Sequence, residues 1–176
     1  QPTGAPEFDA VYLGEMRRLH QFLPVFEALE QLQQRVLLVG QVPPDLMTRL
    51  AHYPGVHCVG RVAHDQVAQQ LRRARYGLNL IPDVLPFSQQ TSTKLLEYCA
   101  AGLQVISTDY AWVRRFEQQH QARFAYLPAQ ADAAGLAEVL AQALSQVAAP
   151  APDLHHLAWP HVLRALRLWQ RLGVVA

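Results

Sequence analysis

The single lysine of this chain lies in a setting that suits a phosphate group. Lys94 directly follows a run of three hydroxyl residues, and the spacing of apolar residues predicts a helix over Thr91–Ala101 that ends at Gly102, a favourable C-terminal cap. A helix start with free N–H groups, small hydroxyl side chains and one ammonium is a phosphate site in outline. The sequence therefore predicts phosphate binding by Lys94, with three neighbours beside it: Thr91, Ser92 and Thr93.

Glu97 lies one helical turn after Lys94, so the two side chains should share a face of the helix. A carboxylate accepts hydrogen bonds from the hydroxyl groups of a sugar. Together the two residues predict a site for a nucleotide sugar. Either residue could instead belong to an ordinary solvated helix surface, and the motif alone leaves that alternative open.

Composition narrows the class of protein. The chain has 176 residues, of which 51% are hydrophobic and 16% charged, which fits one globular domain with a sizeable core. A net charge of +1 gives no long-range attraction to nucleic acid. No apolar run approaches the ~20 residues of a membrane span.

The N-terminus and the cysteines indicate the compartment. The first residues form a Pro/Gly linker without the apolar core of a signal peptide, and the absence of an initiator Met suggests a piece of a longer protein. Cys58 and Cys99 fall inside a predicted strand and a predicted helix. We expect both to be buried free thiols in a reducing, cytoplasmic environment.

Short apolar segments alternate with helical ones along the chain. The expected strands are Phe8–Leu13, Arg35–Val39, Val56–Val59, Tyr76–Ile81, Gln104–Ser107 and Arg123–Leu127. The expected helices are Arg18–Leu32, Pro43–His52, His64–Arg73, Thr91–Ala101, one from Ala111, Ala131–Val147 and Leu157–Leu172. This alternation predicts an α/β fold with a doubly wound, parallel, six-stranded Rossmann-like sheet and helices on both faces. The expected division is a linker at 1–7, a ligand-binding domain at 8–148, and a C-terminal linker and helix at 149–176.

The order of the strands predicts where a ligand binds. In such sheets the ligand lies outside the carboxyl ends of the strands, where the strand order reverses. With the common order 3-2-1-4-5-6, that crevice separates the first strand from the fourth. Gly14, Arg17 and Arg18 follow the first strand, and Lys94 follows the fourth. We expect these cations to converge on a diphosphate, since arginine clamps phosphate and lysine acts as a point charge.

Two details of the predicted site remain open. The sequence does not decide whether Arg17 or Arg18 points inward, and either could begin a solvated helix. Arg61 follows the third strand, so we expect it to border the nucleobase end of a nucleotide.

The sequence of residues 94–108, KLLEYCAAGLQVIST, resembles the donor-site signature of GT-B glycosyltransferases of the large retaining family called group 1, or family 4. That signature reads roughly K-x-x-E-Y-x-A-x-G-x-P-V-I-x-T. Further matches are Tyr12-Leu13-Gly14, Leu37-Leu38-Val39-Gly40, Gly60-Arg61-Val62 and Trp159. The resemblance runs from about Phe8 to the C-terminus and matches only the C-terminal, donor-binding half of such enzymes.

The resemblance implies a role for each matching residue. Glu97 would bind the ribose hydroxyls, while Lys94 and Arg17 or Arg18 would hold the diphosphate, helped by backbone N–H groups of Ser92 and Thr93. The donor would be a UDP-sugar or GDP-sugar, and the protein cations would offset the charge on the leaving diphosphate without a bound metal. No other cofactor is implied.

The resemblance also implies a partner domain, and it shows two departures from the family. The acceptor-binding site and any catalytic base would lie on an N-terminal domain. The isolated chain would therefore bind nucleotide without turnover. The smaller departure is Gln104 in place of the usual Pro, which should affect only the entry to the strand. Gln89 stands eight positions before Glu97, where the family often has an acidic residue. An amide can hydrogen-bond the transferred sugar, but it cannot balance a developing positive charge.

Other functions remain as alternatives. A nucleotide-sugar epimerase would use the same phosphate site, and Gln89 is compatible with a non-catalytic domain that retains the fold. The scattered histidines have no metal-ligand spacing, and no G-x-G-x-x-G follows the first strand. The last predicted helix carries Arg164, Arg167 and Arg171, and it could pack on the protein or lie peripherally on an anionic membrane.

Overall fold

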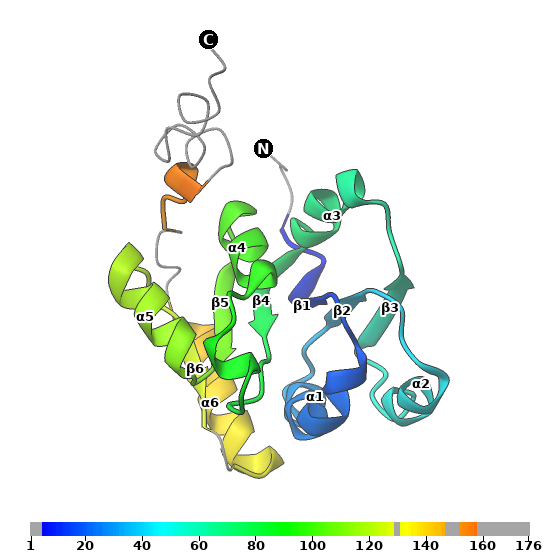
Figure 1. Ribbon diagram of the computed structural model, residues 1–176. Coiled ribbons are helices and arrows are strands. Elements are labelled where there is room, and N and C mark those ends of the chain that lie inside the picture. Colours follow the sequence, from blue (N-terminus) through cyan, green and yellow to red (C-terminus); the bar gives the residue numbers. More distant parts are fainter. Residues whose placement is uncertain (1–4, 129–130, 147–151, 158–176) are drawn as a thin grey trace.

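A computed structural model describes residues 5–128, 131–146 and 152–157. Its core is a six-stranded, fully parallel sheet with the strand order β3-β2-β1-β4-β5-β6 (Figure 1). The strands are β1 Phe8–Leu13, β2 Val36–Val39, β3 Val56–Gly60, β4 Ala74–Asn79, β5 Gln104–Thr108 and β6 Ala125–Leu127. The predicted fold class and strand order are confirmed.

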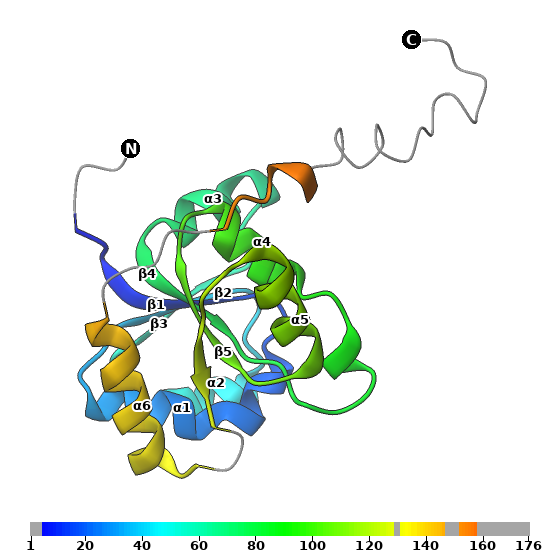
Figure 2. The same ribbon diagram turned by 90° about the vertical axis from the view of Figure 1, so that its left-hand side faces the viewer.

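Helices cover both faces of the sheet (Figure 2). They are α1 Leu23–Gln31, α2 Pro44–Leu50, α3 His64–Leu71, α4 Thr93–Ala100, α5 Ala111–His120 and α6 Ala133–Ser145, with 3-10 turns η1 Arg17–Phe22, η2 Phe87–Gln89 and η3 His155–Leu157. One apolar cluster joins the sheet to α1, α2 and α6, and a second joins it to α3, α4 and α5. All four residues of β2 are consequently buried, as a strand covered on both faces requires.

Two predicted helices begin elsewhere in the structure. The segment expected to be one helix from Arg18 consists of η1 followed by α1, which has Pro24 in its first turn. Proline lacks an N–H donor and its ring collides with the preceding turn, so a continuous helix through this position is unfavourable. Helix α4 begins at Thr93 because the Ser92 hydroxyl accepts a hydrogen bond from Leu95 N and caps the helix.

The two cysteines differ in their exposure. Cys58 was expected to be buried, but it is exposed because β3 is an edge strand whose middle residues face solvent. Cys99 is buried on α4 as expected, and both thiols are free. The predicted C-terminal helix lies outside the described residues, except for Leu157 in η3.

Candidate functional site

The crevice of this fold lies between β1 and β4. The chain leaves β1 toward α1 on one face of the sheet and leaves β4 toward α4 on the other, so the strand order reverses there. Pairing between β1 and β2 extends to Leu13, whereas pairing between β1 and β4 extends only to Val11. The two strands therefore separate at their carboxyl ends.

Tyr98 of α4 stabilises the place where the strands separate. Its phenol oxygen accepts a hydrogen bond from Leu13 N at 2.9 Å and donates one to Leu78 O at 3.2 Å. The ring lies flat against Gly77, where any side chain would overlap it. The Leu13 amide, which has no partner on β4, is thus satisfied by a fully buried side chain.

The crevice brings two cations together from opposite sides. The Nζ of Lys94 donates a hydrogen bond to the Tyr12 hydroxyl at 2.8 Å and lies 4.1 Å from the centre of the Tyr12 ring. Arg18 of η1 stacks its guanidinium on the ring of Phe87, at 4.1 Å from the ring centre. Arg17 is exposed. The structure therefore turns Arg18, and not Arg17, toward Lys94.

These cations influence each other and have no counter-ion among the residues that the structure describes. Burial, and to a smaller extent the charge of Arg18, lower the pKa of Lys94 to about 7, and the charge of Glu15 opposes both effects. Within the described residues, neither Lys94 nor Arg18 forms an ion pair. Two neighbouring cations without a bound carboxylate form a receptor for an anion.

A buried polar network fixes the start of α4. The Asn79 amide donates hydrogen bonds to the Ser107 hydroxyl at 2.9 Å and to the Tyr110 hydroxyl at 3.0 Å. Its carbonyl oxygen accepts from the Ser92 hydroxyl at 2.7 Å. The structure thus gives the Ser92 hydroxyl a structural role instead of a place beside the ligand. Leu95 N is bonded to this hydroxyl, whereas the N–H groups of Thr93 and Lys94 before it have no partner within the helix and keep their potential for an anion.

The hydroxyls of Thr91 and Thr93 are placed differently from that of Ser92. Both residues are exposed at the start of α4, and neither side chain forms a hydrogen bond within the described residues. They therefore remain accessible to a ligand at this end of the crevice.

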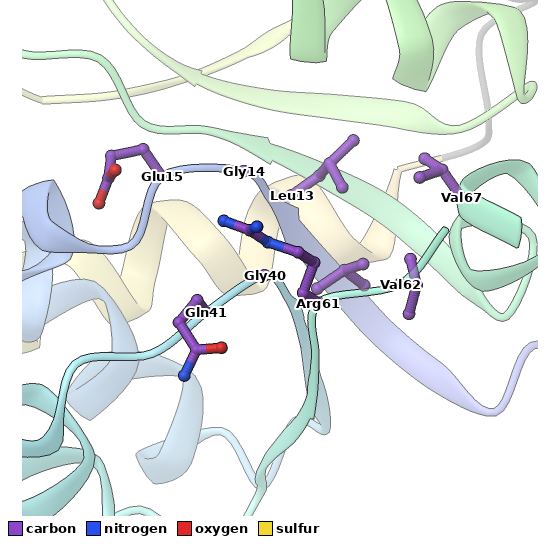
Figure 3. A pocket seen from close by; sticks show the side chains of 9 residues that line it. Leu13, Gly14, Glu15, Gly40, Gln41, Arg61, Val62 and Val67 are labelled. Atoms are coloured by element: carbon purple, nitrogen blue, oxygen red, sulfur yellow. The ribbon is translucent and has the colours of Figure 1, made fainter. Parts of the chain in front are cut away.

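A hollow of about 290 Å³ lies beside the crevice at the ends of β1, β2 and β3. Gly40 has a φ of +149°, and a Cβ there would overlap the Gly14 carbonyl, so the two turns can meet only because residue 40 is glycine. Figure 3 shows Arg61 extending across the hollow toward Gly14, with Gln41 below it on the turn after β2. The hollow is lined by Leu13, Gly14, Glu15, Val39, Gly40, Gln41, Arg61, Val62 and Val67.

Glu97 lines a second hollow, of about 220 Å³, between α3 and α4. It faces His64, and burial raises the pKa of its carboxyl while His64 opposes that shift. Val67 contributes to both hollows, so Glu97 lies next to the first hollow without lining it. Gln89 is exposed at the end of η2, and its side chain forms no hydrogen bond within the described residues.

The site contains residues that the sequence did not single out. Tyr12, Asn79 and Tyr98 were predicted only as parts of strands, a helix or a family signature, and their contacts are made by residues far away in the chain. Gln41 follows the Gly40 turn and carries no motif of its own. The one available signal was the position of Gln41 at the carboxyl end of a strand.

Two classes of site find no support in the described part of the chain. Its His, Cys, Asp and Glu side chains form no group of three or more that could hold a metal ion. None of its helices combines the length and the apolar composition that crossing a membrane requires.

The family is identified by residues 7–146, which match the model of the glycosyl transferases group 1 family. The chain belongs to this family. No curated protein matches it in sequence.

Solved structures of glycosyltransferases share the fold. AviGT4, involved in avilamycin A biosynthesis, has a TM-score of 0.65 at 17% identity, over 99% of this chain and 54% of its own. Alr3699/HepE of Anabaena, in complex with UDP and glucose, has a TM-score of 0.66 at 14% identity. The match covers 97% of this chain and 49% of HepE. WaaG, involved in lipopolysaccharide biosynthesis, has a TM-score of 0.54 at 21% identity. The match covers 81% of this chain and 39% of WaaG. The chain thus spans about half the length of such enzymes or less.

Proposed function

We propose that this chain is the donor-binding half of a glycosyltransferase that transfers a sugar from a nucleotide-diphosphate sugar to an acceptor. The observation that carries the proposal is the convergence of Arg18 and Lys94 on the crevice without a counter-ion in the described part of the chain. A diphosphate would supply the missing negative charge. Arginine can grip it with two parallel hydrogen bonds, and lysine adds a compact charge from the other side.

The neighbouring hollows suit the nucleoside. The first has apolar walls and exposed polar side chains at Gln41 and Arg61, which fits a flat base with polar edges. Glu97 lies beyond Val67, where its carboxylate could accept hydrogen bonds from ribose hydroxyls. The UDP complex of HepE, which has the same fold, supports a UDP-sugar as donor.

The same groups would serve the reaction. When the bond from the sugar to the diphosphate breaks, negative charge grows on the leaving group, and the two cations and the start of α4 would stabilise it. Gln89 would contribute at most a neutral hydrogen bond to the transferred sugar. This scheme assigns no step to a metal.

The rest of the enzyme would come from another domain. Because the chain spans about half of the similar structures, we assign acceptor binding and any catalytic base to the remaining half. We expect the isolated chain to bind donor without turnover. The proposal has three further parts. The transferred sugar is a hexose, the product is a polysaccharide made in the cytoplasm, and the protein contacts the membrane peripherally.

Calorimetry with UDP, GDP and ADP tests the proposal. We expect one of these diphosphates to bind. Arg18→Ala should lower the affinity for it about 10- to 100-fold, which corresponds to the loss of a charge-assisted hydrogen bond. Arg17→Ala is the matched control, since Arg17 is the exposed neighbour, and it should change affinity less than about twofold.

Two results would contradict the proposal. One is an equal loss of affinity in the Arg17 and Arg18 variants. The other is no binding of any diphosphate by the full-length protein. Conversion of a nucleotide sugar by the full-length protein without acceptor would indicate an epimerase instead.

A further inference from the structure

Tyr12 and Lys94 form a pair whose hydrogen-bond direction is fixed by the surrounding structure. The Tyr12 side chain is fully buried, and its hydroxyl donates a hydrogen bond to Glu15 O at 2.9 Å. That bond uses the only hydrogen of the phenol, so its oxygen can only accept from Lys94, which it does at 2.8 Å. The phenol thereby holds the lysine nitrogen at one place on the wall of the crevice.

The surroundings of Lys94 do not favour an ammonium ion in the empty site. The charged and titratable groups around it are Tyr12 from β1, Glu15 from the turn after β1, and Arg18 from η1. The phenol is neutral, since burial raises its pKa well above the usual value. Glu15 is exposed, and its carboxylate accepts a hydrogen bond from Arg17 N. Burial is the larger effect that disfavours the ammonium form, and the positive charge of Arg18 adds to it.

We propose that Tyr12 is a positioning residue for Lys94, and that Lys94 takes up one proton from solvent when a diphosphate binds. The proposal rests on the proposed function and deepens it. Without ligand, the amine keeps its bond to Tyr12 and avoids repulsion from Arg18. The arriving diphosphate supplies the negative charge that makes the ammonium favourable, and the proton returns to solvent when the ligand leaves.

The expected pH dependence follows from the protonated fraction. With a pKa of about 7 in the empty site, about half of the molecules carry a charged Lys94 at pH 7 and about one in a hundred at pH 9. If only the charged form binds tightly, the apparent affinity falls in proportion, about 50-fold between these pH values. The sign is that of a group whose pKa rises on binding, so binding strengthens as pH falls.

Calorimetry with UDP in two buffers of different ionisation enthalpy, such as Tris and bicine, counts the protons directly. At about pH 8.5 the diphosphate is fully ionised, and we expect wild type to take up close to one proton per UDP. Lys94→Arg should bind UDP with no proton uptake, because arginine is charged throughout this range. This variant separates Lys94 from every other titratable group.

Tyr12→Phe tests the positioning role. The variant retains the ring but removes the acceptor that Lys94 has among the described residues, so the charged form of Lys94 becomes less favourable. We expect UDP binding at pH 7 to weaken about tenfold and the proton-uptake curve to move to lower pH. A purely structural role of Tyr12 would lower stability without moving that curve.

The outcomes distinguish the two proposals. Equal binding enthalpies in both buffers for wild type, or an unchanged uptake curve in Tyr12→Phe, would overturn this inference alone. No binding of UDP, GDP or ADP at about pH 6, where Lys94 is charged, would overturn the proposed function and this inference together.

Discussion

Replacing Tyr98 by phenylalanine tests how the crevice is held open. The variant retains the ring that covers Gly77 and removes only the hydroxyl. That hydroxyl accepts from Leu13 N at 2.9 Å and donates to Leu78 O at 3.2 Å. Leu13 N is at the point where β1 has left β4, so no other strand can replace the lost acceptor.

The expected cost follows from the two backbone groups. A buried N–H group left without a partner costs about 1–3 kcal/mol, and the loss at Leu78 O adds little because its bond is longer. We expect the free energy of unfolding to fall by about 2 kcal/mol. For a chain of this length the melting temperature should fall by about 4–8 °C.

Urea unfolding of Tyr98→Phe is best compared with Tyr53→Phe. Tyr53 is half-buried, and its phenol forms no hydrogen bond within the described residues, so its loss should cost less than about 0.5 kcal/mol. Hydrogen exchange at the Leu13 amide should accelerate in the Tyr98 variant alone. Equal stability of the two variants with unchanged exchange at Leu13 would refute the reasoning.

Other substitutions have equally definite outcomes. Gly40→Ala should lower the free energy of unfolding in urea by about 2 kcal/mol or more, because the new Cβ meets a backbone carbonyl. Gly135→Ala is the control: its Cβ makes ordinary contacts inside α6, so the substitution should leave stability unchanged or raise it. Asn79→Ala should lower the free energy of unfolding by about 3 kcal/mol, because the hydroxyls of Ser92, Ser107 and Tyr110 each lose a hydrogen-bond partner in the interior. In native protein a thiol reagent should modify exposed Cys58 and spare Cys99, which is buried and has its pKa raised to about 12; modification of both would contradict the packing of α4.

The sheet could be predicted from the sequence because its signals are local. Short apolar runs end in Gly14, Gly40 and Gly60, and helical spacing separates them, so the alternation and the strand order follow from the known topology of α/β folds. The start of α1 differs from the prediction because Pro24 prevents a continuous helix, which the helical spacing of apolar residues does not reveal. The prediction that Cys58 is buried is wrong because it follows from the apolar run alone. The predicted strand order already places this strand at the edge of the sheet, where its middle residues face solvent.

The charged residues of the site could be predicted from the sequence, but the residues that contact and position them could not. Lys94 and the arginines after β1 could be placed at the crevice from topology alone. Choosing Arg18 over Arg17 required the stacking on Phe87, which comes from a loop elsewhere in the chain. The partners of Tyr12 and Asn79 are likewise distant in sequence, so no local pattern encodes their bonds.

The polar side chains of this site divide into those that hold the scaffold and those that are free of it. Asn79 and Tyr98 are bonded to several elements at once, and their replacement disturbs the fold. Gln41 and Arg61 project from exposed turns and form no hydrogen bond within the described residues. Directed evolution of ligand preference can therefore begin at these two turn positions, where most exchanges leave the stability of the domain unchanged.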